Sequence, residues 1–292
     1  MGVEDFEDYL RSDSPIQCIP YAQVIRSINK HSTQIYGEDE RYGNVFRFFL
    51  SSAYHAKQND LLGRYAFVGQ EATIAHLVNA FGLRVLFFWE GADDIDVVAC
   101  DKGFFEAIAG SYDPFRSEKS NFRNRKISGD KWSIQLESVV YRPGTTDCEV
   151  IGCDVDLWQP EVSSPNICFG GRTLDNHFFS NLQLIPIFGI PVSVPDVYTL
   201  MDLRLNFASI MKEDAQMLMD LTTVLVAMGT DVEKYAESLD RRTARILKKE
   251  VYSCGNEKLR AQPIIVGLQG LEEIKTTLEK TQEFVERYCS LV

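Results

Sequence analysis

The chain has 292 residues, of which 45% are hydrophobic, and this is enough apolar material for about two domains with buried cores. Its 42 acidic and 30 basic side chains give a formal net charge of −12. This charge argues against a general nucleic-acid coat or a wide contact with anionic membranes, although it leaves room for a local basic patch. The acidic N-terminus lacks a signal-peptide pattern and no apolar run approaches a membrane span, so we expect a cytoplasmic protein without a membrane partner.

Seven cysteines and four histidines narrow the chemistry further. The cysteines are scattered, odd in number and form no Cys-x-x-Cys pair, which is typical of buried free thiols in a reducing compartment. No two histidines have the spacing of metal ligands. The sequence therefore argues against a structural zinc site and against Ser-His or Cys-His catalysis.

Apolar periodicity in the first two thirds of the chain predicts helices that alternate with strands. Residues before about 60 are mostly helical in pattern, with Val45, Phe48, Phe49 and Ala53 at helical spacing on the side that faces a core. The elements expected after them are a strand at 65–68, a helix at 70–81, a second strand or the approach to one at 85–89, a strand at 95–99, a polar loop at 116–130, and a hairpin with strands at 132–141 and 148–158. This order predicts an α+β fold with a mixed sheet and flanking helices.

After about residue 195 the pattern becomes helical only. The elements expected there are a helix at 197–211, a helix at 214–228, a third helix that starts in a capping box at 230–233 and stops at Gly255, and a last helix with an apolar face between Leu271 and Tyr288. Gly229 takes the usual glycine position at the end of the second of these helices. The Pro-rich segment 186–195 is expected to join the two halves. The sequence thus predicts an α/β domain with N-terminal helices at 1–190 and a C-terminal helical domain, or bundle, at 191–292.

Two aspartates, Asp94 and Asp96, flank one apolar residue at the start of the strand expected at 95–99. Alternate side chains of a strand share a face, so both carboxylates point the same way while Ile95 and Val97 point into the core. Two oxygen ligands on one rigid strand suit Mg²⁺ that carries nucleotide phosphates. The alternative is a pair of solvated acids at a strand end, because Asp-x-Asp is a common pattern.

Two further features accompany this pair. The preceding strand ends at Gly69 and a helix begins at once with Gln70, so the N–H groups of the helix start form a ready phosphate site. The later strand carries Asp154 and Asp156 on one face, and period alone cannot choose between them as a third carboxylate. Nucleotidyl transfer needs such an arrangement, in which metal ions neutralise a triphosphate and a third carboxylate activates the attacking hydroxyl.

With these residues the sequence resembles the nucleotidyltransferase superfamily with the DNA polymerase β-type fold. Within it the chain looks most like the AbiEii/MNT-type group, some members of which are toxins of toxin–antitoxin pairs. The family pattern is an apolar strand, Gly-Gly or Gly-Ser, a helix, Asp-apolar-Asp-apolar, and a later strand with a third acid. The matching positions are Gly69-Gln70, Asp94-Ile95-Asp96-Val97 and Asp156-Leu157, and in the helical half the segment 194–200, Arg204, Asp214 and Asp220. The resemblance covers roughly residues 65–230.

This resemblance implies that Asp94, Asp96 and Asp156 are catalytic metal ligands. It favours Asp156 over Asp154 as the general base, because the apolar residue after Asp156 fits the family pattern. Nucleotide contacts are implied for Gly69, Gln70 and Arg204. We therefore expect a protein that uses Mg²⁺ or Mn²⁺ to move NMP from an NTP to a hydroxyl of RNA, protein or a small molecule. An antitoxin-like protein is a further expected partner.

Two other functions stay open on the sequence. Gln70 replaces the small second residue of the family pattern, and its bulk favours a nucleotide-binding or partner-binding module without catalysis. Arg204 stands where relatives often carry lysine. An Asp-x-Asp pair also suits a glycosyltransferase that holds a metal-bound nucleotide sugar, but the second acidic strand and the long helical region argue against that class.

Three basic residues, Arg123, Arg125 and Lys126, fall in the polar stretch expected as a loop at 116–130. A solvated loop and a loop that contacts nucleotide both fit this composition.

Overall fold

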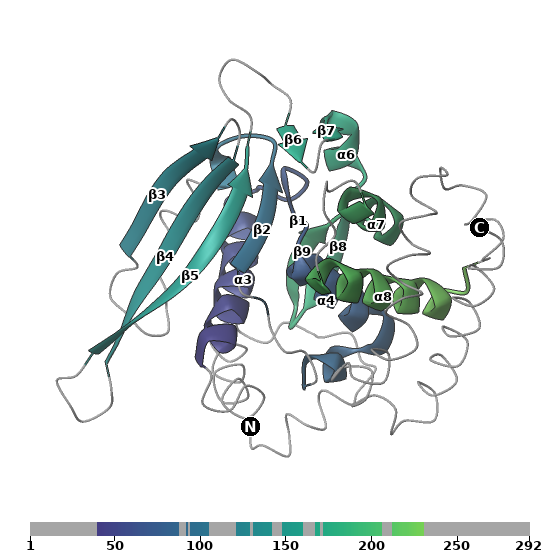
Figure 1. The fold of residues 1–292 in the computed structure, drawn as a ribbon, viewed down its shortest axis with the longest axis horizontal. Helices are drawn as coiled ribbons and strands as arrows, with labels where there is room; N and C mark the ends of the chain where they lie inside the picture. The colour runs from purple at the N-terminus through teal and green to yellow at the C-terminus, as the bar shows by residue number, and fades with distance from the viewer. Residues whose placement is uncertain are drawn as a thin grey trace. The chain divides into compact units, whose positions relative to one another are not determined.

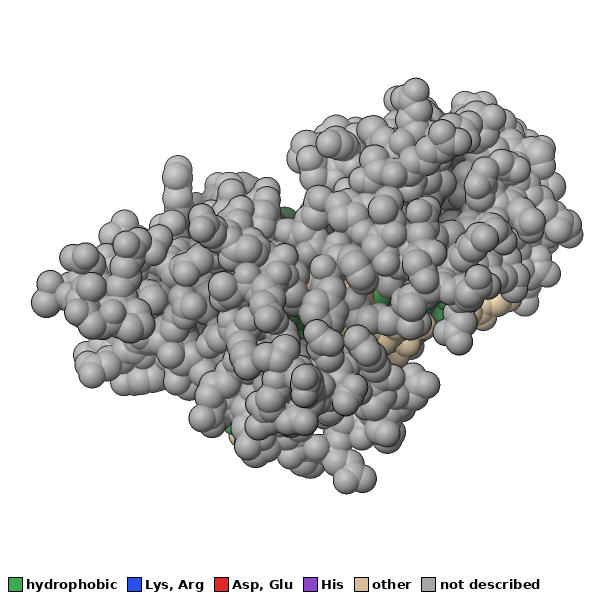
Figure 2. All heavy atoms as spheres, turned by 90° about the horizontal axis from the view of Figure 1, so that it is seen from below, with side chains coloured by type: hydrophobic (Ala, Val, Ile, Leu, Met, Phe, Trp, Pro, Cys, Tyr) green, Lys and Arg blue, Asp and Glu red, His purple; other side chains and the backbone are tan. Residues whose placement is uncertain are grey.

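The computed structural model describes residues 40–87, 92, 94–104, 121–128, 131–141, 148–159, 167–169, 172–205 and 212–230. All other residues are drawn in grey in Figures 1 and 2. The helices expected before residue 40 and after residue 230 therefore lie outside the described residues. The chain divides into two compact units, one made of Met1–Ala75, Glu90–Phe169 and Thr173–Pro195, the other of His76–Trp89, Gly170–Arg172 and Asp196–Val292. The boundary at residue 190 stays a prediction.

The first unit holds the strands and one long helix. Its elements are α3 (Glu40–Gln58), β1 (Tyr65–Phe67), β2 (Asp94–Ala99), β3 (Asn121–Ser128), β4 (Lys131–Tyr141), β5 (Cys148–Trp158), β6 (Ile167–Phe169), α6 (Asn176–Ser180), β8 (Gln183–Ile187) and β9 (Ile190–Val194). The second unit holds η1 (Leu83–Phe87), α7 (Val197–Leu205) and α8 (Lys212–Ala227). Two elements, α4 (Gln70–Phe81) and β7 (Arg172–Leu174), run from one unit into the other.

A five-stranded sheet with the order β1-β2-β5-β4-β3 forms the centre of the first unit (Figure 1). Strands β2 and β5 pair in parallel, and the other neighbouring pairs are antiparallel. The described part of the chain is thus a mixed α/β structure, and the predicted mixed sheet is confirmed. The strands β6-β7 and β8-β9 form two further two-stranded sheets.

The alternation of β2 separates an acidic face from a core face. Ile95 and Val97 are buried, whereas Asp94 and Asp96 are half-buried. Phe67 of β1 pairs with Val97, and its ring meets that of Phe49 on α3 at a centroid distance of 4.7 Å. Opposite residues of neighbouring strands share a face, so α3 packs on the core face and leaves the acidic face on the other side of the sheet.

Three sequence predictions differ from the structure. The stretch at 85–89, expected as a strand or as the approach to one, begins in the 3₁₀ helix η1, which ends at Phe87, and is not a strand there. Leu83, Val85 and Leu86 are all buried there. A short apolar run satisfies a buried helix as well as a buried strand, so its periodicity cannot separate the two.

The polar stretch expected as a loop at 116–130 contains the strand β3. This strand pairs with β4 alone and forms one edge of the sheet. An edge strand gains its hydrogen bonds from one neighbour and tolerates charged side chains, so a polar sequence does not argue against it.

The segment expected as a connection at 186–195 forms most of the β8–β9 hairpin. Its two-residue turn consists of Phe188 and Gly189, with φ angles of 50° and 75°. Two positive φ angles give a type I′ turn, whose twist matches that of paired strands. Pro186 and Pro191, whose composition predicts a linker, stand opposite each other in this hairpin.

Two helix ends of the second unit, the start of α7 and the end of α8, have defined capping contacts. The Asp196 carboxylate accepts hydrogen bonds from the backbone N–H groups of Tyr198 and Thr199, at 3.0 and 3.1 Å, and thereby caps the start of α7. After α8, Gly229 adopts a φ of 74° and the amide of Thr230 donates to the carbonyl of Leu225. None of the helices described is long and apolar enough to cross a membrane.

Candidate metal centre

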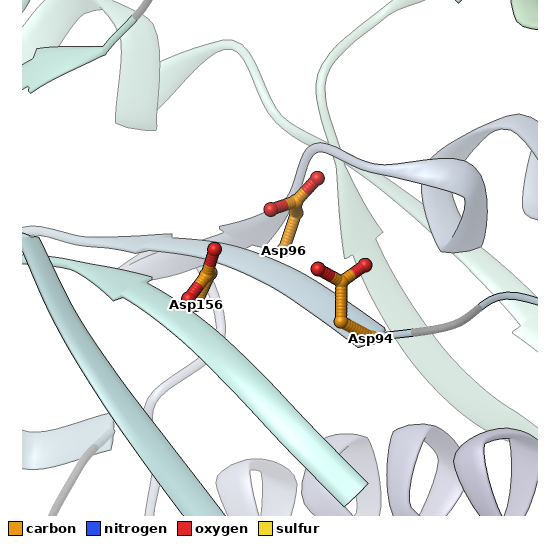
Figure 3. Close-up of side chains that lie close together, drawn as sticks. All are labelled: Asp94, Asp96 and Asp156. Atoms are coloured by element: carbon orange, nitrogen blue, oxygen red, sulfur yellow. The ribbon is translucent and has the colours of Figure 1, made fainter. Parts of the chain in front are cut away.

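Three carboxylates, those of Asp94, Asp96 and Asp156, converge on the acidic face of the sheet (Figure 3). Each is half-buried, and each offers one oxygen atom that lies within 4.8 Å of the oxygens offered by the other two. Figure 3 shows Asp94 and Asp96 rising from one strand and Asp156 from its neighbour, with all three on the same side. This is a set of three hard oxygen ligands, which Mg²⁺ and Mn²⁺ prefer.

The parallel register of β2 and β5 brings these groups together. Asp96 stands directly opposite Asp156. The residues before and after Asp156 in β5, Val155 and Leu157, are buried in the core. Burial of the apolar residues fixes which face each strand presents, and the acids are held on the other face.

Gly69 closes one side of the acidic cluster. The amide of Val68 donates to the carbonyl of Asp96 at 3.0 Å, so the chain leaving β1 runs directly beside Asp96. A Cβ atom on Gly69 would lie 2.8 Å from Cβ and from Oδ2 of Asp96, closer than real contacts of this kind. Only glycine fits here, because any side chain would collide with Asp96. The absence of a side chain lets the backbone at the start of α4 approach the acids closely.

Glu71 is a fourth acid beside this cluster, and the sequence analysis missed it. Its side chain is 1% exposed, and its Oε2 atom lies 2.8 Å from the point that a Cβ on Gly69 would occupy. Asp96 and Glu71 therefore both border Gly69. A glutamate in the first turn of a helix is usually solvated and interacts favourably with the positive end of the helix dipole. The burial of Glu71 could therefore not be foreseen from the sequence.

The charge of the cluster is its main physical property. Two like charges about 4.8 Å apart repel by on the order of 3 kcal/mol at the effective dielectric constant typical of partly buried protein sites. A divalent cation placed among the three carboxylates would convert this repulsion into attraction. The geometry, the half-burial and the ligand chemistry therefore all fit a metal ion of the Mg²⁺ or Mn²⁺ kind.

The other predicted residues lie in several places. Gln70 is half-buried as the first residue of α4. Asp154 stands opposite Asp94 in the β2–β5 register, but its side chain lies outside the described residues, so the choice between Asp154 and Asp156 stays a prediction. Arg204 is buried on α7 in the second unit.

Asp220, one of the acids that matched the family pattern, is buried on α8 and is 5% exposed. Burial raises the pKa of this carboxyl to about 8. The side chain of Asp214, on the same helix, lies outside the described residues.

Comparisons with known proteins add two alignments. No family model matches the chain, and no curated protein matches it. One solved structure, described as a "putative nucleotidyltransferase from H. pylori", is 10% identical, with 87% of this chain and 96% of that chain covered at a TM-score of 0.45. JHP933 from Helicobacter pylori is 11% identical, with 87% and 94% covered at a TM-score of 0.46. At these values neither alignment assigns a function to this chain.

Replacement of Gly69 by alanine tests the geometry of the cluster. Because the added methyl group would push Asp96 and Glu71 aside, we expect Gly69→Ala to weaken Mn²⁺ binding by about tenfold or more. Titration of free Mn²⁺ by electron paramagnetic resonance measures this. The neighbouring change Gln70→Ala adds no atom near the acids and serves as the control. Equal Mn²⁺ affinity of Gly69→Ala and the parent would show that the cluster does not bind metal as described.

Asp220 makes the stability of the chain depend on pH. Because its folded pKa of about 8 exceeds the ordinary value, the folded state binds the proton more tightly than the unfolded state. The free energy of unfolding should therefore fall between about pH 4 and pH 8, by at most about 1.4 kcal/mol per pH unit. Asp220→Asn should remove this fall in urea unfolding curves, whereas Asp202→Asn, at a half-buried position on α7, should keep it. An unchanged pH profile for Asp220→Asn would contradict the burial of an ionisable group.

Proposed function

We propose that this protein is a nucleotidyltransferase that uses Mg²⁺ or Mn²⁺ to transfer NMP from an NTP to a hydroxyl acceptor. One observation carries the proposal: three half-buried carboxylates from two adjacent parallel strands offer oxygen atoms within 4.8 Å of one another. Asp94, Asp96 and Asp156 would hold the cation. When bound there, the cation neutralises charge on the phosphates during the transfer.

The chain's own groups divide the work between two sides of the site. Asp156 comes from β5, on the side of Asp96 away from β1. There it accepts the proton of the attacking hydroxyl and thereby strengthens the nucleophile. Gly69 and the start of α4 lie on the opposite side, next to β1. Their N–H groups suit the β- and γ-phosphates, which leave as pyrophosphate.

A metal-dependent binding module without transfer is the second candidate. Glu71 favours it, because this buried acid occupies the space beside Gly69 and Asp96, where phosphates would bind, and offers them no positive group. Gln70 also favours this second candidate, since the family pattern has a small residue at that position. The finer parts of the proposal, an AbiEii/MNT-type toxin role with an antitoxin-like partner and a cytoplasmic location, are supported by the sequence pattern alone.

Asp94→Asn tests the metal site through the nucleotide. Loss of one charged ligand should lower the affinity for Mg²⁺·ATP by about tenfold or more, and the fold should survive because Asp94 lies outside the core. Isothermal titration calorimetry with ATP, with and without Mg²⁺, measures this. Asp60→Asn makes the same chemical change at an exposed position of a turn and should leave the affinity unchanged. Equal affinity of Asp94→Asn and the parent would remove Asp94 from the site.

Asp156→Asn separates transfer from binding. As the general base, Asp156 should matter for the chemical step, so the variant should keep its NTP affinity within severalfold. Its transfer of label from α-³²P-NTP to total RNA or cell lysate should fall by about a hundredfold or more. Asp154→Asn is the matched control on the same strand and should be milder. A dead Asp154→Asn beside an active Asp156→Asn would exchange the two roles, and a parent that labels nothing would favour the binding module.

A further inference from the structure

Two rows of residues cross the sheet from the acids to its far edge. The backbone register gives the first row as Asp96, Asp156, Ser133 and Arg125, and the second as Asp94, Asp154, Gln135 and Arg123. Residues that stand directly opposite one another on neighbouring strands belong to the same face of a sheet. The positions of Arg123 and Arg125 on the edge strand β3 therefore lie on the acidic face.

Strand spacing sets the length of these rows. Neighbouring strands lie about 4.8 Å apart, so the backbone of Arg125 is roughly 10 Å from that of Asp156 and roughly 14 Å from that of Asp96. Along β3 the two arginine positions are about 7 Å apart, because they are separated by two residues of a strand. The positions between arginine and acid, Ser133 and Gln135 on β4, are uncharged. The two arginine positions are thus too far from the acids for direct ion pairs at backbone level, and they extend the site outward.

The chemistry of the transfer decides which substrate reaches β3. In a phosphoryl displacement the attacking and leaving oxygens lie roughly in line, on opposite sides of the phosphorus. With the pyrophosphate at Gly69, next to β1, the acceptor hydroxyl approaches from the β5 side. Beyond β5 the sheet continues into β4 and β3. The arginine positions therefore lie along the acceptor's path and away from the triphosphate.

We infer that Arg123 and Arg125 bind the phosphodiester backbone of the acceptor, a single strand of nucleic acid whose terminal hydroxyl reaches Asp156. This inference rests on the proposed function and names its acceptor. A nucleic-acid strand carries one phosphate per nucleotide. It can therefore place phosphates at β3 and, one or two nucleotides further on, its terminal hydroxyl at β5. A small molecule would not extend across both strands. Arginine suits this contact because its planar guanidinium donates two parallel hydrogen bonds to one phosphate.

The transfer step on such an acceptor balances simply. The terminal hydroxyl oxygen of the strand forms a bond to the α-phosphorus of the NTP, and the bond from that phosphorus to the bridging oxygen of pyrophosphate breaks. The hydroxyl proton passes to the carboxylate of Asp156. The strand leaves one nucleotide longer, and no oxidant or reductant takes part.

Local charge limits the extent of the contact. On one side the next row of this face holds Glu137, opposite Asn121 and Gly152, so the basic positions end there; on the other side the next row holds Lys131, opposite Trp158 and Ser128. The chain as a whole carries a net charge of −12, which opposes wide contact with a polyanion. Binding should therefore be modest and local, with a salt dependence that reflects about two phosphates.

Lys126 provides a matched control on the same strand. Its row contains Trp132, Leu157 and Val97, and the last two are fully buried. Lys126 therefore occupies a position on the core face of the sheet, whereas Arg125 occupies one on the acidic face. Removal of its charge changes the net charge of β3 without touching the acidic face.

The test uses the full chain with fluorescein-labelled oligouridylate and oligothymidylate strands that carry a free 3′ hydroxyl. Fluorescence anisotropy at several salt concentrations measures their affinity, and the two strands distinguish an RNA from a DNA acceptor. Arg123→Ala/Arg125→Ala should weaken binding of the preferred strand by about tenfold or more and reduce the salt slope by roughly one to two. Lys126→Ala should stay within about twofold of the parent, as expected for a residue that contacts no phosphate.

Two further measurements keep the interpretation specific. Arg123→Lys/Arg125→Lys should restore most of the binding, and circular dichroism should show that the alanine variant is folded. The affinity of the alanine variant for Mg²⁺·ATP should equal that of the parent, a readout separate from the Asp94→Asn test of the proposed function. Absence of binding by the parent, or equal binding by the alanine variant, would overturn the inference. Loss of ATP affinity in the alanine variant would do so as well, because it would assign the arginines to the nucleotide.

Discussion

The parallel pairing of β2 with β5 is the constraint on which the candidate site depends. It is the one parallel pair in the described five-stranded sheet, and it places Asp96 directly opposite Asp156. A register slip of one residue would turn Asp156 into the core and expose Leu157 instead. The fully buried Leu157 and Val97 oppose such a slip, so the apolar face of the sheet maintains the acidic face.

Charge and space act together around this pairing. Three carboxylates on one face repel one another, and Gly69 brings a helix start against Asp96 where any side chain would collide with it. A divalent cation bound among the three carboxylates would offset this repulsion. The same sheet continues through β4 to the two arginine positions on β3, which the register places on the face that carries the acids.

The sequence predicts those parts of the fold that local pattern controls. The helix at 70–81 and the strand at 148–158 agree with α4 and β5, and the alternation around Ile95 correctly separates acids from core. Features that depend on partners far away in the chain escape it. The register between β2 and β5, the edge pairing that makes a polar stretch into β3, and the burial of Glu71 beside Gly69 all arise from long-range packing. The acidic residues could thus be named from sequence, but the register that sets Asp96 opposite Asp156 could not.

The most direct test of the account is a crystal structure of the protein grown with Mn²⁺ and a non-hydrolysable NTP analogue, with diffraction recorded at the manganese absorption edge. The account predicts an anomalous peak within coordination distance of Asp94, Asp96 and Asp156, with the β- and γ-phosphates of the analogue against the backbone of Gly69. An anomalous peak elsewhere in the molecule, or a fully occupied nucleotide with no metal at these three carboxylates, would contradict it.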